Sequence, residues 1–217
     1  MTPGASEGTG LPAASSTTRP EAYAPGRAAP TAHGPAPFMA GMPTTGNVKI
    51  LAMLVDFADM PHYNDASHIE SDLFGEGGDP TDFPYESLRQ YYIRSSYEQL
   101  YIDGDVLGWY TTAYNRDAFP GEQELIKELF QYYDGQGHDF SQYDNDSDGV
   151  IDYFIIIWAG HHTGWSSQWW AHKTNFHDSG FTVDGKTLKT YSWNYEYRYA
   201  EGESPGDFIP RTVIHET

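Results

Sequence analysis

Residues 143–162 read YDNDSDGVIDYFIIIWAGHH, and this stretch contains the strongest secondary-structure signal in the chain. Its second half, residues 150–159, is an almost continuous apolar run that is rich in isoleucine and aromatic side chains. A short run of this kind is typical of a strand buried on both faces, as in a parallel or mixed sheet with helices on each side. We therefore expect residues 150–159 to form the central strand of a mixed α/β fold.

The flanking sequence supplies the other elements of that fold. Apolar residues at helical spacing predict helices over residues 84–97, with Asp82 as N-cap, and over residues 122–133. Tight-turn pairs at Asp103-Gly104 and Asp184-Gly185 predict a hairpin or bent strand over 101–110 and a hairpin over 181–197. A buried strand over 48–57 and a short helix over 209–217 complete the mixed sheet with flanking helices.

Composition narrows the range of possible functions. The 217 residues carry 31 acidic and 12 basic side chains, for a net charge of -19. Such a surface repels phosphate backbones and anionic lipid head groups, so we expect neither nucleic acid nor membranes as partners. The longest strongly apolar run, residues 153–159, is far shorter than the roughly 20 residues of a transmembrane helix. Because the chain has no cysteine, any transition-metal site must use histidines and carboxylates.

Residues 1–47 differ in character from the rest of the chain. They are rich in Pro, Gly and Ala, and Tyr23 and Phe38 are their only aromatic residues. A core cannot be built from this composition, so we interpret residues 1–47 as a disordered leader or linker. They lack the basic start and apolar segment of a secretory signal peptide. Residues 48–217 hold the whole excess of negative charge and are expected to form one domain.

The aspartate-rich segment that precedes the central strand has the spacing of a calcium-binding loop. Asp144, Asp146 and Asp148 occupy alternate positions, Gly149 allows a sharp turn, and the Val150 carbonyl follows. This arrangement wraps oxygen ligands around a hard cation such as Ca²⁺. Asp152 would be the last side-chain ligand. The segment is not an EF-hand, because Ile155 stands where that motif has a bidentate glutamate. The alternative is a solvated acidic turn without an ion.

Residues 213–217, VIHET, contain the first half of the zinc motif H-E-x-x-H. In that motif two histidines four residues apart share one helix face, and the glutamate is the general base for a zinc-bound water. His215 would be a zinc ligand and Glu216 the base. A His-Glu pair is common by chance, so on its own it is a weak signal. The second histidine of the motif would lie two positions beyond Thr217.

A third group of residues combines histidines with tryptophans. His161, His162, His172 and His177 alternate with Trp165, Trp169 and Trp170. The imidazoles predict a second transition-metal site, a substrate-binding rim or ordinary loop residues. The tryptophans suit a cleft for a peptide or a sugar, so a calcium-binding, non-catalytic carbohydrate-binding module is an alternative function. A glycoside hydrolase is the least favoured reading, because no carboxylate pair stands out.

From Val48 onward the chain resembles the immune inhibitor A family of secreted bacterial zinc metalloproteases. The segments that carry the resemblance occur in the family's order: VKILAMLVDF (48–57), SSYEQLYIDGDVLGWY (95–110), YDNDSDGVIDYFIIIWAGHH (143–162), WWAHK (169–173) and VIHET (213–217). The aspartate loop and buried strand, about 55 residues before the His-Glu pair, are its most diagnostic part. The resemblance implies the upstream half of a zincin-like catalytic domain.

The resemblance also implies a function and its cofactors. His215 would be the first zinc ligand, Glu216 the catalytic base, and Asp144, Asp146, Asp148 and Asp152 the ligands of a structural calcium. The substrate would be a polypeptide and the location extracellular. The sequence stops within the zinc motif, so we expect a fragment that is inactive as written. The sequence gives no indication of the oligomeric state.

Overall fold

The structure is a computed structural model that describes residues 41–76, 86–165, 167–197 and 206–217. Its strands are β1 (Gly46–Phe57), β2 (Leu100–Thr112), β3 (Val150–Trp158), β4 (His172–Asn175), β5 (Thr182–Val183) and β6 (Lys186–Tyr195). Its helices are α1 (Ala66–Phe74), α2 (Leu88–Ser95), α3 (Glu122–Gly135) and α4 (Arg211–Glu216), with single 3-10 turns η1 (Arg116–Ala118) and η2 (Phe140–Tyr143). The predicted mixed α/β class is confirmed.

The strands form one mixed sheet in the order β2-β1-β3-β6-β4, and β5 also pairs with β6. β1 runs parallel to β2 and β3, and β3 runs parallel to β6. β4 and β5 are antiparallel to β6. The prediction of a central strand over residues 150–159 is confirmed, because β3 lies in the middle of this order and its residues after Val150 are buried. Its apolar run fills the cores on both faces of the sheet.

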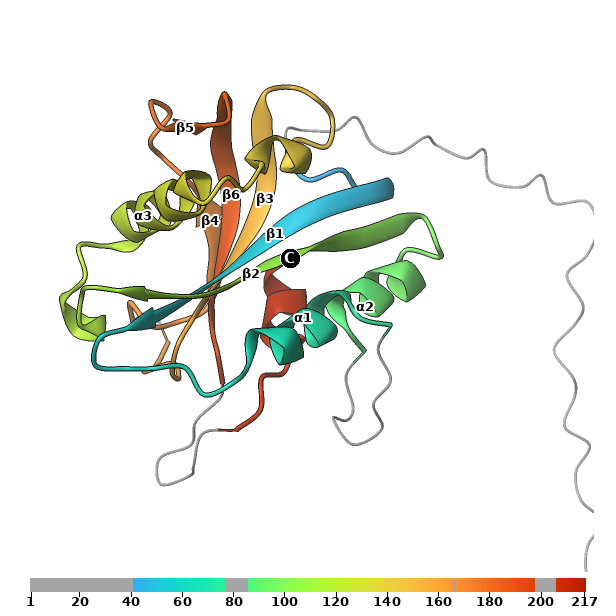
Figure 1. Cartoon of the computed structure of the whole chain (residues 1–217). Coiled ribbons are helices and arrows are strands. Elements are labelled where there is room, and N and C mark those ends of the chain that lie inside the picture. The colour runs from blue at the N-terminus through green and yellow to red at the C-terminus, as the bar shows by residue number, and fades with distance from the viewer. Residues whose placement is uncertain (1–40, 77–85, 166, 198–205) are drawn as a thin grey trace, which may run out of the picture. The chain divides into compact units, whose positions relative to one another are not determined.

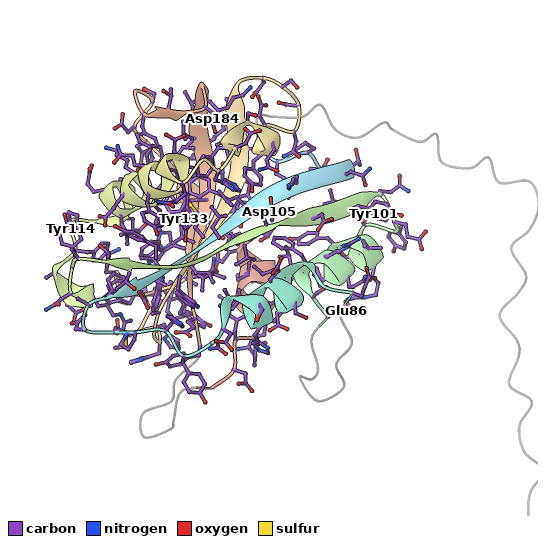
Figure 2. The ribbon with its side chains drawn as sticks, viewed as in Figure 1. Glu86, Tyr101, Asp105, Tyr114, Tyr133 and Asp184 are labelled. Carbon is purple, nitrogen blue, oxygen red and sulfur yellow. The ribbon has the colours of Figure 1, made fainter. Side chains whose placement is uncertain are left out.

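Helices cover both faces of the sheet (Figure 1). α3 packs on one face through Leu125, Ile126, Leu129 and Phe130, which join a core with alternate residues of β1 and β3. Tyr133 of α3 points towards β2, where its hydroxyl donates a hydrogen bond to the Gly108 carbonyl (Figure 2). On the opposite face, α1, α2 and α4 cover a second core. The sheet is therefore buried on both sides, as the apolar strands require.

Segment 101–110 was predicted as a hairpin or a bent strand, and it forms one strand, so the hairpin alternative is wrong. β2 runs through Asp103 and Gly104 without turning, and these residues pair with Lys49 and Ile50 of β1. Gly104 serves close packing rather than a turn, because a Cβ atom there would come within 2.2 Å of the Ile50 carbonyl oxygen of β1 and within 2.6 Å of the Phe74 ring of α1. A register shift opposite Met53 and Leu54 interrupts the ladder and gives the strand an irregularity.

Other predicted elements are confirmed with adjusted bounds. α2 begins after Ser87, whose hydroxyl accepts a hydrogen bond from the Gln90 amide at 3.2 Å. The predicted cap Asp82 and the predicted helix start at residue 84 lie outside the described residues. The hairpin over 181–197 exists as β5 and β6. Asp184 and Gly185 adopt φ of 51° and 74° in its turn, and the Asp184 carboxylate accepts a hydrogen bond from the Phe140 amide (Figure 2).

α1 and β4 were not predicted from the sequence. α1 is nine residues long and buries Ile69, Leu73 and Phe74, but its sequence, ASHIESDLF, is too short for a clear helical period. β4 has four residues with alternating half-buried and exposed side chains. Within the part of the chain that the structure describes, no helix has both the length and the apolar character needed to span a bilayer.

Candidate functional site

The short helix α4 holds His215 and Glu216 against the body of the domain. It begins after Pro210, whose carbonyl accepts a hydrogen bond from the Ile214 amide at 2.8 Å. Val213 is 1% exposed and packs in the core shared with α1 and α2. The Tyr92 hydroxyl of α2 donates a hydrogen bond to the Ile214 carbonyl at 3.3 Å. These contacts fix the inner face of α4, and the next two residues, His215 and Glu216, turn towards a pocket.

This pocket has a volume of about 520 Å³ and brings together three parts of the chain. Its wall combines the loop after β3, the end of β6 and the outer face of α4. The Tyr195 hydroxyl lies 2.7 Å from the Thr212 hydroxyl, which links β6 to α4. Besides His215 and Glu216, the lining residues include His162, Trp165, Trp170, Tyr195, Arg211 and Thr212. The structure thus places one histidine of the predicted cluster, His162, in the same pocket as the His-Glu pair.

The predicted histidine cluster is not assembled as one metal site. His172 points to α3, with its Nε2 3.2 Å from the Glu122 carboxylate and its Nδ1 2.9 Å from the Trp170 carbonyl. The hydrogen bond to Glu122 raises the pKa of His172, and burial, which acts in the opposite direction, does not cancel it. His177 is exposed, and its backbone amide donates to Gln123. Within the described residues, the one group of three or more side chains close enough to share an ion is formed by aspartates.

The three tryptophans do not form one sugar-binding platform. Trp169 is 5% exposed, and its ring lies 5.4 Å from that of Phe57 in the core. Its indole Nε1 donates a hydrogen bond to Asp117 at 2.9 Å. Trp165 is 82% exposed, and Trp170 is half-buried. Only the last two remain accessible, which weakens the case for a carbohydrate-binding module.

The aspartate loop lies at the opposite end of β3 from the pocket. Carboxylate oxygens of Asp144, Asp146 and Asp148 lie within 4.8 Å of one another. The Asp144 carboxylate accepts hydrogen bonds from the amides of Asp148 and Gly149, each at 3.0 Å. Gly149 has a φ of 92°, which favours glycine, as the loop pattern requires. The loop is therefore closed around its own carboxylates.

One of the negative charges in this loop is paired with a lysine from β6. The Lys186 Nζ lies 2.7 Å from the Asp144 carboxylate. Burial alone would raise the pKa of Asp144, but the hydrogen bonds from Lys186 and from the Gly149 amide outweigh it, so the pKa is lowered. Asp144 thus stays ionised, as a cation ligand must. Lys186 was not predicted as part of the site, because it lies 42 positions away in the sequence.

Asp152, the remaining predicted carboxylate ligand, has different surroundings. Its side chain is 1% exposed at the start of β3, and its Oδ2 accepts hydrogen bonds from the backbone and side-chain nitrogens of Asn145. Burial, and to a lesser extent the charges of Asp146 and Asp148, raise the pKa of Asp152 to about 6. It does not belong to the group of three oxygens. The roles of Asp152 and of the Val150 carbonyl as ligands stay predictions.

A buried carboxylate that the sequence did not reveal, Glu196, directly follows the pocket residue Tyr195 in the chain. Glu196 is 1% exposed and accepts hydrogen bonds from the amides of Tyr63 at 2.6 Å and Gly160 at 3.1 Å. It also accepts from the Asn64 amide, and the Asn64 side chain in turn accepts from the Phe208 amide at 2.9 Å. Glu196 and Asn64 therefore tie together the loop after β1, the loop after β3 and the segment that leads into α4.

Arg116 also holds the loop after β3 in place. It is 5% exposed, and its guanidinium carbon lies 5.0 Å from the Trp158 ring and 4.5 Å from the Trp169 ring. It donates a hydrogen bond to the His161 carbonyl. Burial lowers the pKa of Arg116, although neighbouring acidic groups oppose that effect. No local pattern marks Arg116 or Glu196 in the sequence, because their partners lie far away along the chain.

The amino-acid sequence is similar to those of two known bacterial proteins. No protein-family profile matches the chain. Immune inhibitor A of Bacillus thuringiensis subsp. alesti is 26% identical over an alignment of 198 residues, which covers 67% of this chain and 28% of that protein. The resemblance to immune inhibitor A is confirmed. Pre-pro-metalloprotease PrtV of Vibrio cholerae serotype O1, in two strains, is 26% identical over 152 residues, 51% of this chain and 17% of that protein.

The chain therefore spans less than a third of the length of immune inhibitor A and of PrtV. PrtV is a metalloprotease by name.

Proposed function

We propose that this chain carries part of the catalytic domain of a zinc-dependent endopeptidase, with His215 as a zinc ligand and Glu216 as general base. The observation that carries the proposal is the placement of the His-Glu pair on a helix beside a pocket of about 520 Å³. The similarity to immune inhibitor A and PrtV supports it. Polypeptides are the proposed substrates, and the proposed location is extracellular.

The side chains that line the pocket would supply part of a catalytic zinc site. A catalytic zinc is held by three protein ligands and leaves one position for water. His215 is exposed towards the pocket, and Glu216 is the adjacent carboxylate. The described residues contribute His215 as one ligand. In H-E-x-x-H the second histidine lies one helical turn later on the same face, so the proposal requires histidine four positions after His215.

Glu216 has the role of moving a proton. When bound, zinc makes water acidic and polarises the scissile carbonyl. The Glu216 carboxylate accepts a proton from the attacking water and passes it to the amine that leaves. The rest of the pocket holds the polypeptide and excludes bulk water. His162 and Arg211 line the same pocket.

The test uses the protein encoded by the complete gene. We expect Glu216→Gln to retain zinc, measured by elemental analysis, and to lose about 100-fold or more in kcat for peptide hydrolysis. The control is Glu70→Gln, which changes an exposed carboxylate on α1 and should leave kcat unchanged. Peptide hydrolysis at the wild-type rate by Glu216→Gln would remove Glu216 from the mechanism.

We further propose that the aspartate loop binds calcium in a structural role. Three carboxylates within 4.8 Å and the positive φ of Gly149 support the proposal. A bound ion would link the start of β3 to η2 and would stabilise the fold by about 2.7 kcal/mol at a calcium concentration 100-fold above Kd.

We expect added calcium to raise the Tm of the chain, measured by calorimetry, and chelation to reverse the rise. The double variant Asp146→Ala/Asp148→Ala should lose this response. A matched control, Glu70→Ala/Asp134→Ala, removes the same charge from exposed helix positions and should keep it. A Tm that is insensitive to calcium in the wild type would rule out a calcium site in this loop.

A further inference from the structure

The pocket beside the His-Glu pair has walls made largely of rings. Trp165 is 82% exposed at its rim, and Trp170, Tyr195 and His162 continue the wall inward. An indole that is left this exposed does not stabilise the fold. Exposed aromatic surface next to a polar site is characteristic of a contact with a ligand. The position of Trp165 therefore points to binding.

The inner part of the wall is held in a fixed geometry. The His162 ring lies 5.5 Å from that of Trp170 and 5.2 Å from that of Tyr195. The Tyr195 hydroxyl lies 2.7 Å from the Thr212 hydroxyl of α4. The neighbour of Trp170, Trp169, is buried in the core. A ligand that enters the pocket thus meets preformed ring faces, and little order has to be created when it binds.

The charged groups of the pocket are of both signs. Besides His162 and His215, the lining contains the guanidinium of Arg211 and the carboxylate of Glu216. Two charges of opposite sign favour neither an acidic nor a basic guest. The volume of about 520 Å³ admits a large side chain. The ligand group that best fits this pocket is therefore neutral, bulky and able to stack on aromatic rings.

We propose that this pocket is a specificity subsite for an aromatic side chain of the polypeptide substrate, next to the bond on which Glu216 acts. This assignment rests on the proposed peptidase function. Trp165 and Trp170 contact the ring of the substrate, and Tyr195 closes the inner end. The order of preference among substrate residues is tryptophan and phenylalanine first, then leucine, then alanine and charged residues, because ring faces add stacking to the burial of apolar surface.

The first test measures binding to the chain itself and does not depend on turnover. Blocked peptides of one length and charge, differing only in a central Phe, Leu, Ala or Glu, are titrated by calorimetry. We expect the Phe peptide to bind about 10-fold or more tightly than the Ala peptide. Trp165→Ala should remove most of that difference. The control Tyr97→Ala removes a ring that is 88% exposed outside the pocket and should leave the difference unchanged.

Equal affinities for the Phe and Ala peptides would overturn the subsite, and so would a Phe preference that survives Trp165→Ala. Saturable binding of oligosaccharides in place of peptides would also overturn it.

A second test separates the subsite from the proposed peptidase. The protein encoded by the complete gene is given a mixture of peptides, and the cleaved bonds are identified by mass spectrometry. Cleavage next to aromatic residues, lost selectively in Trp165→Ala, supports both proposals. Cleavage without aromatic preference refutes the subsite and leaves the peptidase in place. Aromatic peptide binding without any cleavage supports the aromatic pocket and refutes the peptidase.

Discussion

The two ends of β3 are built in opposite ways. At its start, the aspartate loop gathers three carboxylates from five consecutive residues, Asp144 to Asp148. At its end, the pocket with His215 and Glu216 gathers side chains from the loop after β3, the end of β6 and α4. The carboxylates of the loop are arranged mainly by hydrogen bonds from its own backbone amides. The pocket owes its shape to a few buried polar contacts between distant segments. A local site can be recognised from sequence, whereas an assembled one has to be seen in the fold.

Among variants that should affect the pocket end of β3 and not the aspartate loop, Glu196→Gln is expected to cause the largest loss of stability. Glu196→Gln replaces a buried carboxylate acceptor by an amide and leaves one of its donors, the Gly160 amide or the Tyr63 and Asn64 amides, without a good partner. We expect a loss of about 3 kcal/mol in the free energy of unfolding, measured by urea denaturation.

The same variant tests whether the two ends are independent. Glu196→Gln should weaken binding of the Phe peptide to the pocket and leave the calcium response of the Tm in place. Glu70→Gln, on the exposed face of α1, should change stability by less than about 0.5 kcal/mol. Loss of the calcium response in Glu196→Gln would show that the two ends behave as one unit.

A smaller loss of stability is expected from a change at Lys186, which lies 42 positions from Asp144 in the sequence and contacts the aspartate loop. Lys186→Met removes the ammonium 2.7 Å from Asp144 and leaves its negative charge uncompensated. Without calcium we expect the variant to be less stable by about 1 kcal/mol. With calcium, the ion no longer competes with an ammonium, and its affinity should rise about 10-fold, measured by calorimetric titration.

Lys127→Met provides the matched control for Lys186. Its ammonium lies 2.7 Å from Asp178, far from the loop in sequence, and its loss should not change calcium affinity. If Lys186→Met binds calcium more weakly than the wild type, then Lys186 supports the ion site instead of competing for it.

The smallest effect is a pH dependence from His172, which joins β4 to α3 near the pocket. Because its hydrogen bond to Glu122 raises its pKa in the folded state, the folded protein binds this proton more tightly than the unfolded chain. This stabilisation is complete below the ordinary histidine pKa of about 6.5 and is lost as pH rises through the higher folded value. The side chain is 35% exposed, so solvent screening should limit the contribution to below about 1 kcal/mol.

His172→Gln should remove this part of the pH dependence, measured as the free energy of unfolding between about pH 6 and pH 9. The exposed His177, changed to Gln, serves as control and should leave the profile as it is in the wild type. If His172 instead made the wild type more stable as the pH rises over this range, the proposed contribution of the His172–Glu122 contact would be refuted.

Much of the fold could be predicted because its signals are local. The apolar run of β3 and the helical period of α3 lie within single segments, and both elements have almost the predicted bounds. The aspartate spacing likewise identified three carboxylates that the structure brings together. Each of these features depends on residues a few positions apart.

The features that sequence reasoning missed depend on contacts between distant residues. Gly104 was interpreted as a turn residue, but it is needed for close packing, because a Cβ atom there would come within 2.2 Å of the Ile50 carbonyl oxygen and within 2.6 Å of the Phe74 ring. The contact of Glu196 with Asn64 spans 132 positions, and that of Lys186 with Asp144 spans 42. The tryptophans were expected to suit a cleft, and Trp165 and Trp170 do line the pocket, but the sequence did not show that Trp169 turns into the core.

The strand order of the sheet affects how fast the chain folds. The parallel ladders join distant segments, since Leu51 pairs with Phe154 and Gly46 pairs with Leu100. The β5–β6 hairpin, where Val183 pairs with Lys186, is local. Chains dominated by long-range pairings fold slowly, because loop closure precedes any gain from contacts. We expect slow refolding from denaturant, with early hairpin formation and aggregation at high concentration while β1 and β3 are still unpaired.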